Sequence, residues 1–214
     1  GELQTIGQLA VFPLVTRGSG QLPCILLSDA LADGTVQIGE VGEGDVPTLR
    51  VENRGKTNVL VLDGEQLIGA KQNRTANRSI LLGAESITDI PVSCMERGRW
   101  SYKDRNFRST RDHSPAKVRR KAREAEKQAV RDQRVASPQT LASTQSAVWQ
   151  EIEGLSTKLG VKSATGALDE AYESRRTDFD TWARLFPRVD GQVGLMALTP
   201  KKVFGLDVIG SERL

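Results

Sequence analysis

The sequence predicts an α+β protein with an antiparallel, β-rich sandwich or barrel-like core that carries a helical insertion. The first hundred residues contain short segments rich in Val, Ile and Leu, separated by glycine-containing turns, with no helix-period pattern between them. The middle of the chain changes to a helix-compatible composition, and the end returns to a strand pattern. We expect one compact domain, with a β core over 1–105, a basic loop and helical insertion over 106–190, and a hairpin over 191–214 that rejoins the core.

The predicted strands of the core are short and closely spaced, and Gly, Asn or Asp marks the turns between them. They are Leu9–Leu14, Pro23–Ser28, Thr35–Val41, Thr48–Val51, Asn58–Leu62, Ser79–Leu82 and Ile87–Cys94. Near the end of the chain, Gln192–Leu198 and Val203–Ile209 are two more predicted strands. Because a turn sequence with Pro200 separates them, we expect them to form a hairpin.

Three helices are predicted in the insertion. Ser114-Pro115 begins the first, since Ser is a good N-cap and Pro suits the first helical position. Its apolar stripe is narrow, so we expect a helix that is mostly solvated, docks weakly or orders only with a partner. The segment Ser101–Gln145, which contains it, is the one that we expect to be mobile. The stripe consists of Val118, Ala122, Ala125 and Ala129, and the helix is expected to run to about Val135. The other two helices are expected at Ser146–Leu159 and Gly166–Phe186, the last with a break near Arg175–Asp178.

The composition excludes several classes of protein. The chain has 214 residues, 38% of them apolar, and its longest apolar runs are a handful of residues. A membrane-spanning helix needs about 20 consecutive apolar residues, so none is expected. The two cysteines, Cys24 and Cys94, are too few for a disulfide framework or a zinc site. They are typical of a cytoplasmic protein with free thiols, and we expect that location and no membrane contact.

Positive charge is concentrated in one segment. Residues 97–134 contain 14 Lys and Arg against 5 Asp and Glu, whereas the rest of the chain has 16 against 22. A basic segment in an acidic chain can contact nucleic acid, bind an acidic ligand or lie against the protein's own acidic surface. All three alternatives are open, although Glu124, Glu126 and Asp132 within the segment count against nucleic acid.

The run from Asp63 to Arg74 is the most informative stretch of the chain. Its glycines let the backbone approach a ligand closely, and Lys71 and Arg74 are donors suited to phosphate. Between them lie two amides, Gln72 and Asn73. The run is not a Walker A loop, because Ala precedes Lys71 and Gln follows it, and it lacks the third glycine of a dinucleotide-binding fingerprint. The alternative is a solvated hairpin loop whose amides cap backbone groups.

A second polar cluster extends from Pro91 to Trp100. Cys94 has positively charged neighbours, which lower a thiol pKa, and could form a nucleophile with the only histidine, His113. We favour a buried strand cysteine, which is the commoner environment of a lone cysteine. Trp100 and Tyr102, interleaved with basic residues, could stack a base and hold its phosphates. Equally, they could belong to a strand whose aromatic residues face the core.

Carboxylates in these two clusters could take part in chemistry. Glu65 and Glu96 are the candidates for general acid–base work, and with Asp63 they could hold Mg²⁺ as a cofactor. The sequence contains no metal-ligand spacing, so we assign no metal site.

Several motifs together resemble a known family. They are Asp63-Gly64-Glu65-x-Leu67-x-Gly69-Ala70-Lys71-Gln72-Asn73-Arg74, Asn77-x-Ser79, Pro91-Val92-Ser93-Cys94-x-Glu96-x-Gly98-Arg99-Trp100, Ala147-Val148-Trp149, Gly160-Val161-x-Ser163-x-Thr165-Gly166-Ala167-Leu168 and Gly191-Gln192-Val193-Gly194. The sequence resembles the bacterial and archaeal ARG- and rhodanese-phosphatase-associated protein domain family, formerly a domain of unknown function. The resemblance spans most of Leu9 to Ile209. The family continues past this chain's end with a helix, so we expect Leu214 to mark a truncation.

The resemblance to this family implies a class of ligand. The family name reflects an association with ADP-ribosylglycohydrolase and phosphatase-like domains, which implies the handling of ADP-ribose or other NAD-derived nucleotides. In that setting Lys71 and Arg74 would contact a pyrophosphate, Gln72 and Asn73 polar ligand groups, and Glu65 a ribose or a metal ion.

The leading hypothesis is a domain that binds, and could process, a phosphorylated nucleotide such as ADP-ribose. Its expected ligand-binding residues are Lys71, Gln72, Asn73, Arg74, Arg99 and Trp100, and its catalytic candidates are Glu65 and Glu96. A second hypothesis is a nucleic-acid-binding module that uses Arg97–Arg134. A third is a non-catalytic interaction scaffold whose helical segment, Ser114–Phe186, docks a partner or forms a homo-oligomer.

Overall fold

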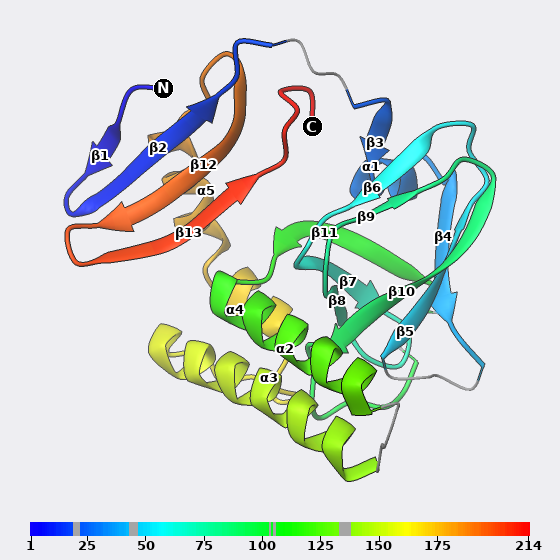
Figure 1. The fold of residues 1–214 in the computed structure, drawn as a ribbon. Coiled ribbons are helices and arrows are strands. Elements are labelled where there is room, and N and C mark those ends of the chain that lie inside the picture. Colours follow the sequence, from blue (N-terminus) through cyan, green and yellow to red (C-terminus); the bar gives the residue numbers. More distant parts are fainter. Residues whose placement is uncertain (19–21, 43–46, 103, 105, 133–137) are drawn as a thin grey trace. The chain divides into compact units, whose positions relative to one another are not determined.

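The chain is described by a computed structural model that covers residues 1–18, 22–42, 47–102, 104, 106–132 and 138–214 (Figure 1). It divides into two compact units. Unit 1 combines Gly1–Pro23 with Arg175–Leu214, and unit 2 is Cys24–Ser174. The domain boundaries expected after residues 105 and 190 follow composition and stay a prediction. The expected helix end near Val135 lies outside the described residues.

A six-stranded sheet forms the centre of unit 2. In spatial order its strands are β11 (Phe107–His113), β7 (Glu65–Gly69), β8 (Arg74–Ala76), β10 (Ser86–Cys94), β5 (Thr48–Asn53) and β4 (Val36–Glu40). Every neighbouring pair is antiparallel. The edge strands β4 and β11 also contact each other, so the sheet curls into a half-barrel (Figure 1). The predicted α+β class with an antiparallel, barrel-like core is confirmed.

Alternation along the strands fills the half-barrel with apolar side chains. In β4, for example, Val36 and Ile38 are buried while Gln37 between them is exposed. The buried cluster of this core is Leu27, Ala30, Val36, Ile38, Leu49, Val51, Val59, Val61, Leu67, Ala70, Ala76, Leu82, Ile90, Val92 and Phe107. The same alternation carries one step further to Glu40, at the end of β4.

A smaller sheet completes this core. It consists of β3 (Cys24–Leu26), β6 (Asn58–Val61) and β9 (Ile80–Leu82), and β3 pairs with β6 in parallel. The strand predicted at Pro23–Ser28 is correct only in part, because helix α1 (Leu27–Ala32) begins inside it. Leu27 and Ala30 of this helix are completely buried, and this burial overrides the strand pattern of the local sequence.

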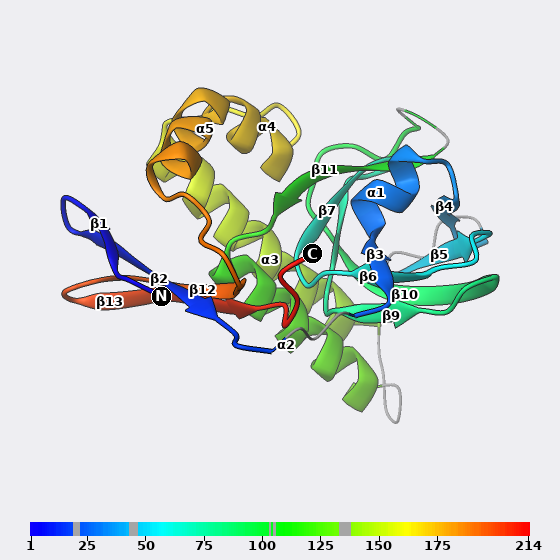
Figure 2. The ribbon, with the colours of Figure 1, turned by 90° about the horizontal axis from the view of Figure 1, so that it is seen from above.

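Three helices of unit 2 form a second core. They are α2 (Ala116–Asp132), α3 (Pro138–Leu159) and α4 (Leu168–Glu173), and α2 and α3 run beside each other (Figures 1 and 2). Val118 and Ala122 are buried against Val148 and Ile152. The first helix thus docks on α3 through part of its narrow stripe, and its other described side chains are half-buried or exposed. The rest of that stripe, Ala125 and Ala129, lies outside the described side chains.

Unit 1 contains a four-stranded antiparallel sheet. Its order is β1 (Gln4–Ile6), β2 (Leu9–Val15), β12 (Gln192–Thr199) and β13 (Lys202–Val208), so the C-terminal hairpin pairs with the N-terminal strands as a rejoining hairpin should. Helix α5 (Arg176–Leu185) accompanies this sheet. The third predicted helix is thus divided into α4 and α5 near the expected break. No helix within the described residues is long and apolar enough to cross a membrane.

Candidate functional site

The two polar clusters singled out in the sequence meet at one end of the half-barrel. Because the strands are antiparallel, this end collects the last residues of β4, β7 and β10 and the first residues of β8 and β11. Register confirms it, with Arg74 opposite Cys94 and Phe107 opposite Gly69. We call six side chains at this end the rim cluster: Glu40, Lys71, Gln72, Arg74, Trp100 and Tyr102.

Arg74 is the buried centre of the rim cluster. Its side chain is 0% exposed, and its Nη2 lies 3.7 Å from Oε1 of Glu40, whose side chain is 5% exposed. Its Nη1 donates to the side-chain oxygen of Gln72 at 3.2 Å. The alternative of a hairpin loop holds only in part. Its amides do cap backbone groups, since the Gly69 amide donates to the Asn73 side-chain oxygen at 3.3 Å, but the loop is not solvated there, because Gln72 and Arg74 are buried.

Lys71 and two aromatic rings form the outer part of the cluster. The Lys71 ammonium lies 5.5 Å from the ring centroids of both Trp100 and Tyr102, within the range of cation–π attraction. The Arg74 guanidinium lies 5.9 Å from the Trp100 ring. Trp100 and Tyr102 are 51% and 58% exposed and lie outside any strand, so the alternative of a strand with core-facing aromatics is wrong.

A saturated polar network holds the segment that carries Trp100. Arg99 binds Glu96 through Nη2 at 2.7 Å and donates from Nη1 to the carbonyl oxygens of Ala70 and Ser101. Burial raises the pKa of Glu96, but hydrogen bonds from Arg99 and from the backbone amide of Asn73 outweigh it and hold that pKa below its usual range. This network ties the segment beside Trp100 to the turn before β8.

Asn73 extends this network to a helix. Its side-chain oxygen accepts from Arg99 Nη2 at 3.1 Å, and its side-chain nitrogen donates to Asp169 of α4 at 2.9 Å. Of the predicted ligand-binding residues, Asn73 and Arg99 therefore direct their side-chain hydrogen bonds to other groups of the protein. Their role as ligand contacts stays a prediction, and the contacts observed link the turn before β8 to the segment before Trp100 and to α4.

The turn between β7 and β8 explains the glycine in the motif. Gly69 has a φ of 143°, and a Cβ at this position would clash with the carbonyl oxygen of Asn106. Ala70, which follows, has a positive φ of 41°. A turn held in sparsely populated backbone conformations needs support from its surroundings, and Arg99 supplies it through the Ala70 carbonyl.

A comparison with models of protein families shows to which family the chain belongs. The model of the ARG and Rhodanese-Phosphatase-superfamily-associated Protein domain, ARPP-1, matches residues 1–214. The chain belongs to this family. The resemblance noted from its motifs is thereby confirmed. Searches of curated proteins and of solved structures gave no match. In this ARPP-1 domain, the family-like motifs at residues 63–74 and 91–100 supply four of the six residues of the rim cluster, and Glu40 and Tyr102 lie outside them.

Glu65, a catalytic candidate, lies on β7 in the same phase as Leu67 of the core. It is buried and accepts hydrogen bonds from the Ser109 hydroxyl at 2.9 Å and from the Leu62 amide at 3.3 Å. Burial raises its pKa, and those two hydrogen bonds only partly offset the effect. No interaction among the described residues joins Glu65 to Glu96 or to Arg74. Its catalytic role stays a prediction.

The thiol of Cys94 is not poised for nucleophilic attack. Burial raises its pKa to about 11, even though the Arg74 guanidinium beside it acts in the opposite direction. His113 lies at the end of β11, and β7 and β8 separate that strand from β10. The favoured interpretation of Cys94 as a buried strand cysteine agrees with this environment.

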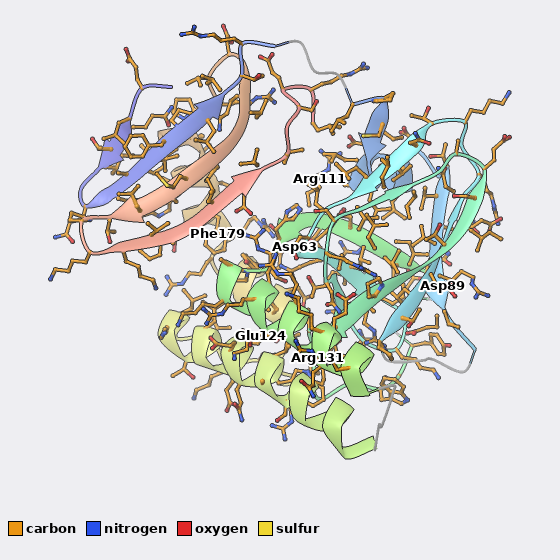
Figure 3. The ribbon with its side chains drawn as sticks, in the orientation of Figure 1. Asp63, Asp89, Arg111, Glu124, Arg131 and Phe179 are labelled. Carbon is orange, nitrogen blue, oxygen red and sulfur yellow. The ribbon has the colours of Figure 1, made fainter. Side chains whose placement is uncertain are left out.

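Much of the basic segment is paired with the protein's own acids. Asp63 lies beside α2 and accepts from Arg123 at 2.8 Å, with Arg119 at 3.9 Å (Figure 3). Arg111 binds Asp29 of α1 at 2.8 Å. Of the three alternatives for this segment, these contacts favour contact with the protein's own acidic residues. No group of three or more His, Cys, Asp or Glu suited to a metal ion occurs among the described residues.

Glu40 is the member of the rim cluster that our sequence interpretation missed. Its signal was present, because Val36, Ile38 and Glu40 share one phase of the strand alternation, which is the core-facing phase. A carboxylate in a core-facing position is an exception that calls for a partner. That partner, Arg74, is far away in sequence, so local pattern alone could not supply it.

Proposed function

We propose that the rim cluster binds a phosphorylated nucleotide, such as ADP-ribose or another NAD-derived metabolite. The proposal depends on one observation: the Lys71 ammonium lies 5.5 Å from the ring centroids of both Trp100 and Tyr102. Both aromatic residues are more than half exposed. A nucleotide needs a flat surface for its base and a cation for its phosphates. Exposed aromatic rings and a lysine supply these two features.

The charges beneath the aromatic rings support this division of roles. Arg74 is buried and paired with Glu40, so we assign the phosphate contact to Lys71, whose ammonium lies beside the two exposed rings. The Arg74 guanidinium also lies 5.9 Å from the Trp100 ring. Each contact of this kind contributes about 0.5–2 kcal/mol, enough to bias the ring towards one orientation.

Family context supports the chemistry proposed. The family name refers to an association with ARG domains, which implies ADP-ribose or related nucleotides as the ligand class. Two buried free cysteines fit the cytoplasmic location that we propose. Processing of the ligand is an additional hypothesis, to be assayed with the same nucleotides, with Glu65 and Glu96 as its catalytic candidates.

Thermal-shift measurements with a panel of ligands test this function. The panel contains ADP-ribose, NAD, nucleoside phosphates and a short oligonucleotide, each with and without Mg²⁺. We expect a nucleotide to raise the melting temperature by mass action, and Lys71→Ala to abolish the shift. Lys56→Ala, at an exposed position outside the cluster, is the matched control and should keep it.

The same panel separates the alternatives. A shift with the oligonucleotide alone, reduced by salt, would favour the nucleic-acid hypothesis over ours. An identical nucleotide shift in the wild type and in Lys71→Ala would remove the rim cluster as the binding site.

A further inference from the structure

The ion pair at the base of the rim cluster is incompletely hydrogen-bonded. Both carboxylate oxygens of Glu40 and the Nε and Nη2 atoms of Arg74 are buried and have no hydrogen-bond partner among the described residues. At 3.7 Å, the Nη2–Oε1 distance is an ion pair but too long for a hydrogen bond. Buried polar atoms are almost always hydrogen-bonded, so four such atoms in one place call for a missing partner.

The chemistry of the two side chains restricts that partner. An ionised carboxylate only accepts hydrogen bonds and a guanidinium only donates them. A partner for both must donate to Glu40 and accept from Arg74. A fully ionised phosphate group cannot donate to Glu40 and is repelled by its charge, and a metal cation cannot accept from Arg74. A hydroxyl group does both, and two adjacent hydroxyls match the two free oxygens of Glu40 and the two free nitrogens of Arg74.

We propose that Glu40 and Arg74 form an inner subsite that binds the vicinal diol of a sugar. The proposal rests on the proposed function, in which the sugar is the ribose of the nucleotide. Gln72 accepts the hydrogen bond of Arg74 Nη1, which orients the guanidinium and leaves Nε and Nη2 for the ligand. In this arrangement Lys71 contacts the phosphates, the aromatic rings contact the base, and the buried pair selects the sugar.

Entry to the inner subsite requires movement of Trp100. Arg74 is completely buried, and the Trp100 ring is 5.9 Å from its guanidinium. Trp100 is half exposed and lies outside the strands, so its side chain can shift without breaking the sheet. Binding of a diol therefore changes the environment of this indole.

A pair of nucleotides that differ only in the diol tests the inference on the wild-type protein. Calorimetric titration with AMP and with 2′,3′-dideoxy-AMP compares the two, and inorganic pyrophosphate measures the phosphate contribution alone. We expect AMP to bind at least about tenfold more tightly than the dideoxy analogue, the effect of losing hydrogen bonds to charged groups. We expect Glu40→Gln to lower the affinity for AMP to a similar extent and not to lower the affinity for pyrophosphate.

Controls separate this inference from the proposed function. Glu52→Gln, on a carboxylate outside the rim cluster, should change none of the affinities. Equal binding of AMP and its dideoxy analogue, with affinity that depends on Lys71, would overturn the diol subsite while the proposed function stands. The buried pair would then be completed by water molecules only. If neither nucleotide nor pyrophosphate binds, both proposals are overturned. The comparison of ligands decides the matter even if Glu40→Gln fails to fold.

Discussion

The Nη2 atom of Arg74 lies 3.7 Å from Oε1 of Glu40, and this pair links β8 to β4 in the buried end of the half-barrel. The two strands are separated by β10 and β5 in the sheet. The pair is therefore a tertiary contact that curling of the sheet makes possible. Two opposite charges in a buried site depend on each other, because either one alone would be left uncompensated.

This dependence predicts strong coupling between the two side chains. Glu40→Leu or Arg74→Met alone should lower the free energy of unfolding by about 3–5 kcal/mol, since each leaves a buried charge unpaired. The double variant should lose much less than the sum of the two. Urea unfolding of the wild type, the two single variants and the double variant measures the coupling energy. Losses of unfolding free energy that simply add would show that the two charges do not interact.

Because the pKa of Glu96 is lowered in the folded protein, we expect the stability of the protein to depend on pH. The pKa of Glu96 is lower in the folded protein than in the unfolded chain, where it is about 4.3. The unfolded chain therefore takes up a proton first, so the stabilisation is complete above about pH 4.3 and is lost as the pH falls through the folded-state pKa. Unfolding free energies should decrease more steeply below that pH in the wild type than in Glu96→Gln.

A matched variant checks that this slope belongs to the network around Glu96. Glu124→Gln removes a carboxylate in an exposed pair with Lys121, and exposed pairs contribute little. Its slope should stay close to that of the wild type. If Glu96→Gln also retains the wild-type slope, the network does not stabilise the ionised carboxylate.

We expect the thiol of Cys94 to react slowly with thiol reagents in the folded protein. With a pKa of about 11, almost none of it is thiolate near neutral pH, and it is also buried. In a Cys24→Ser background, a thiol-specific disulfide reagent should modify the folded protein slowly and the denatured protein quickly. Fast modification of the folded protein at neutral pH would show instead that the site activates this thiol.

The strands with regular apolar alternation could be predicted from the sequence, and the polar ones could not. The predicted strand Thr48–Val51 lies where expected, because its alternation reflects a sheet with one buried face. The C-terminal hairpin also lies where expected, and there the turn sequence around Pro200 was the signal, since its strands are half-buried or exposed throughout. In β7 and β8, buried Glu65 and Arg74 interrupt the pattern, so this stretch was interpreted as a loop. A polar side chain can be buried when it has a hydrogen-bonding or charged partner, and that partner can lie far away in the sequence. The local sequence therefore does not reveal which polar residues are buried.

The candidate site shows the same limit. The sequence identified Lys71, Arg74 and Trp100 by chemical type, and the structure brings these three together. It did not reveal that Asn73 is bound to Asp169, which lies 96 residues further along the chain. Amides and arginines that bind ligands and those that hold loops have the same sequence signature, and only their partners distinguish them.

The most direct test of the account is a calorimetric titration of ADP-ribose into the wild type and Trp100→Ala. Trp100 is half exposed and lies outside the strands, so Trp100→Ala should stay folded, with a melting temperature lowered by only a few degrees through the lost cation–π contacts. Stacking of a base on an aromatic side chain contributes about 1–3 kcal/mol, so we predict that the dissociation constant rises at least about fivefold. An unchanged dissociation constant in Trp100→Ala, or the absence of binding to the wild type, would contradict a nucleotide site at the rim cluster.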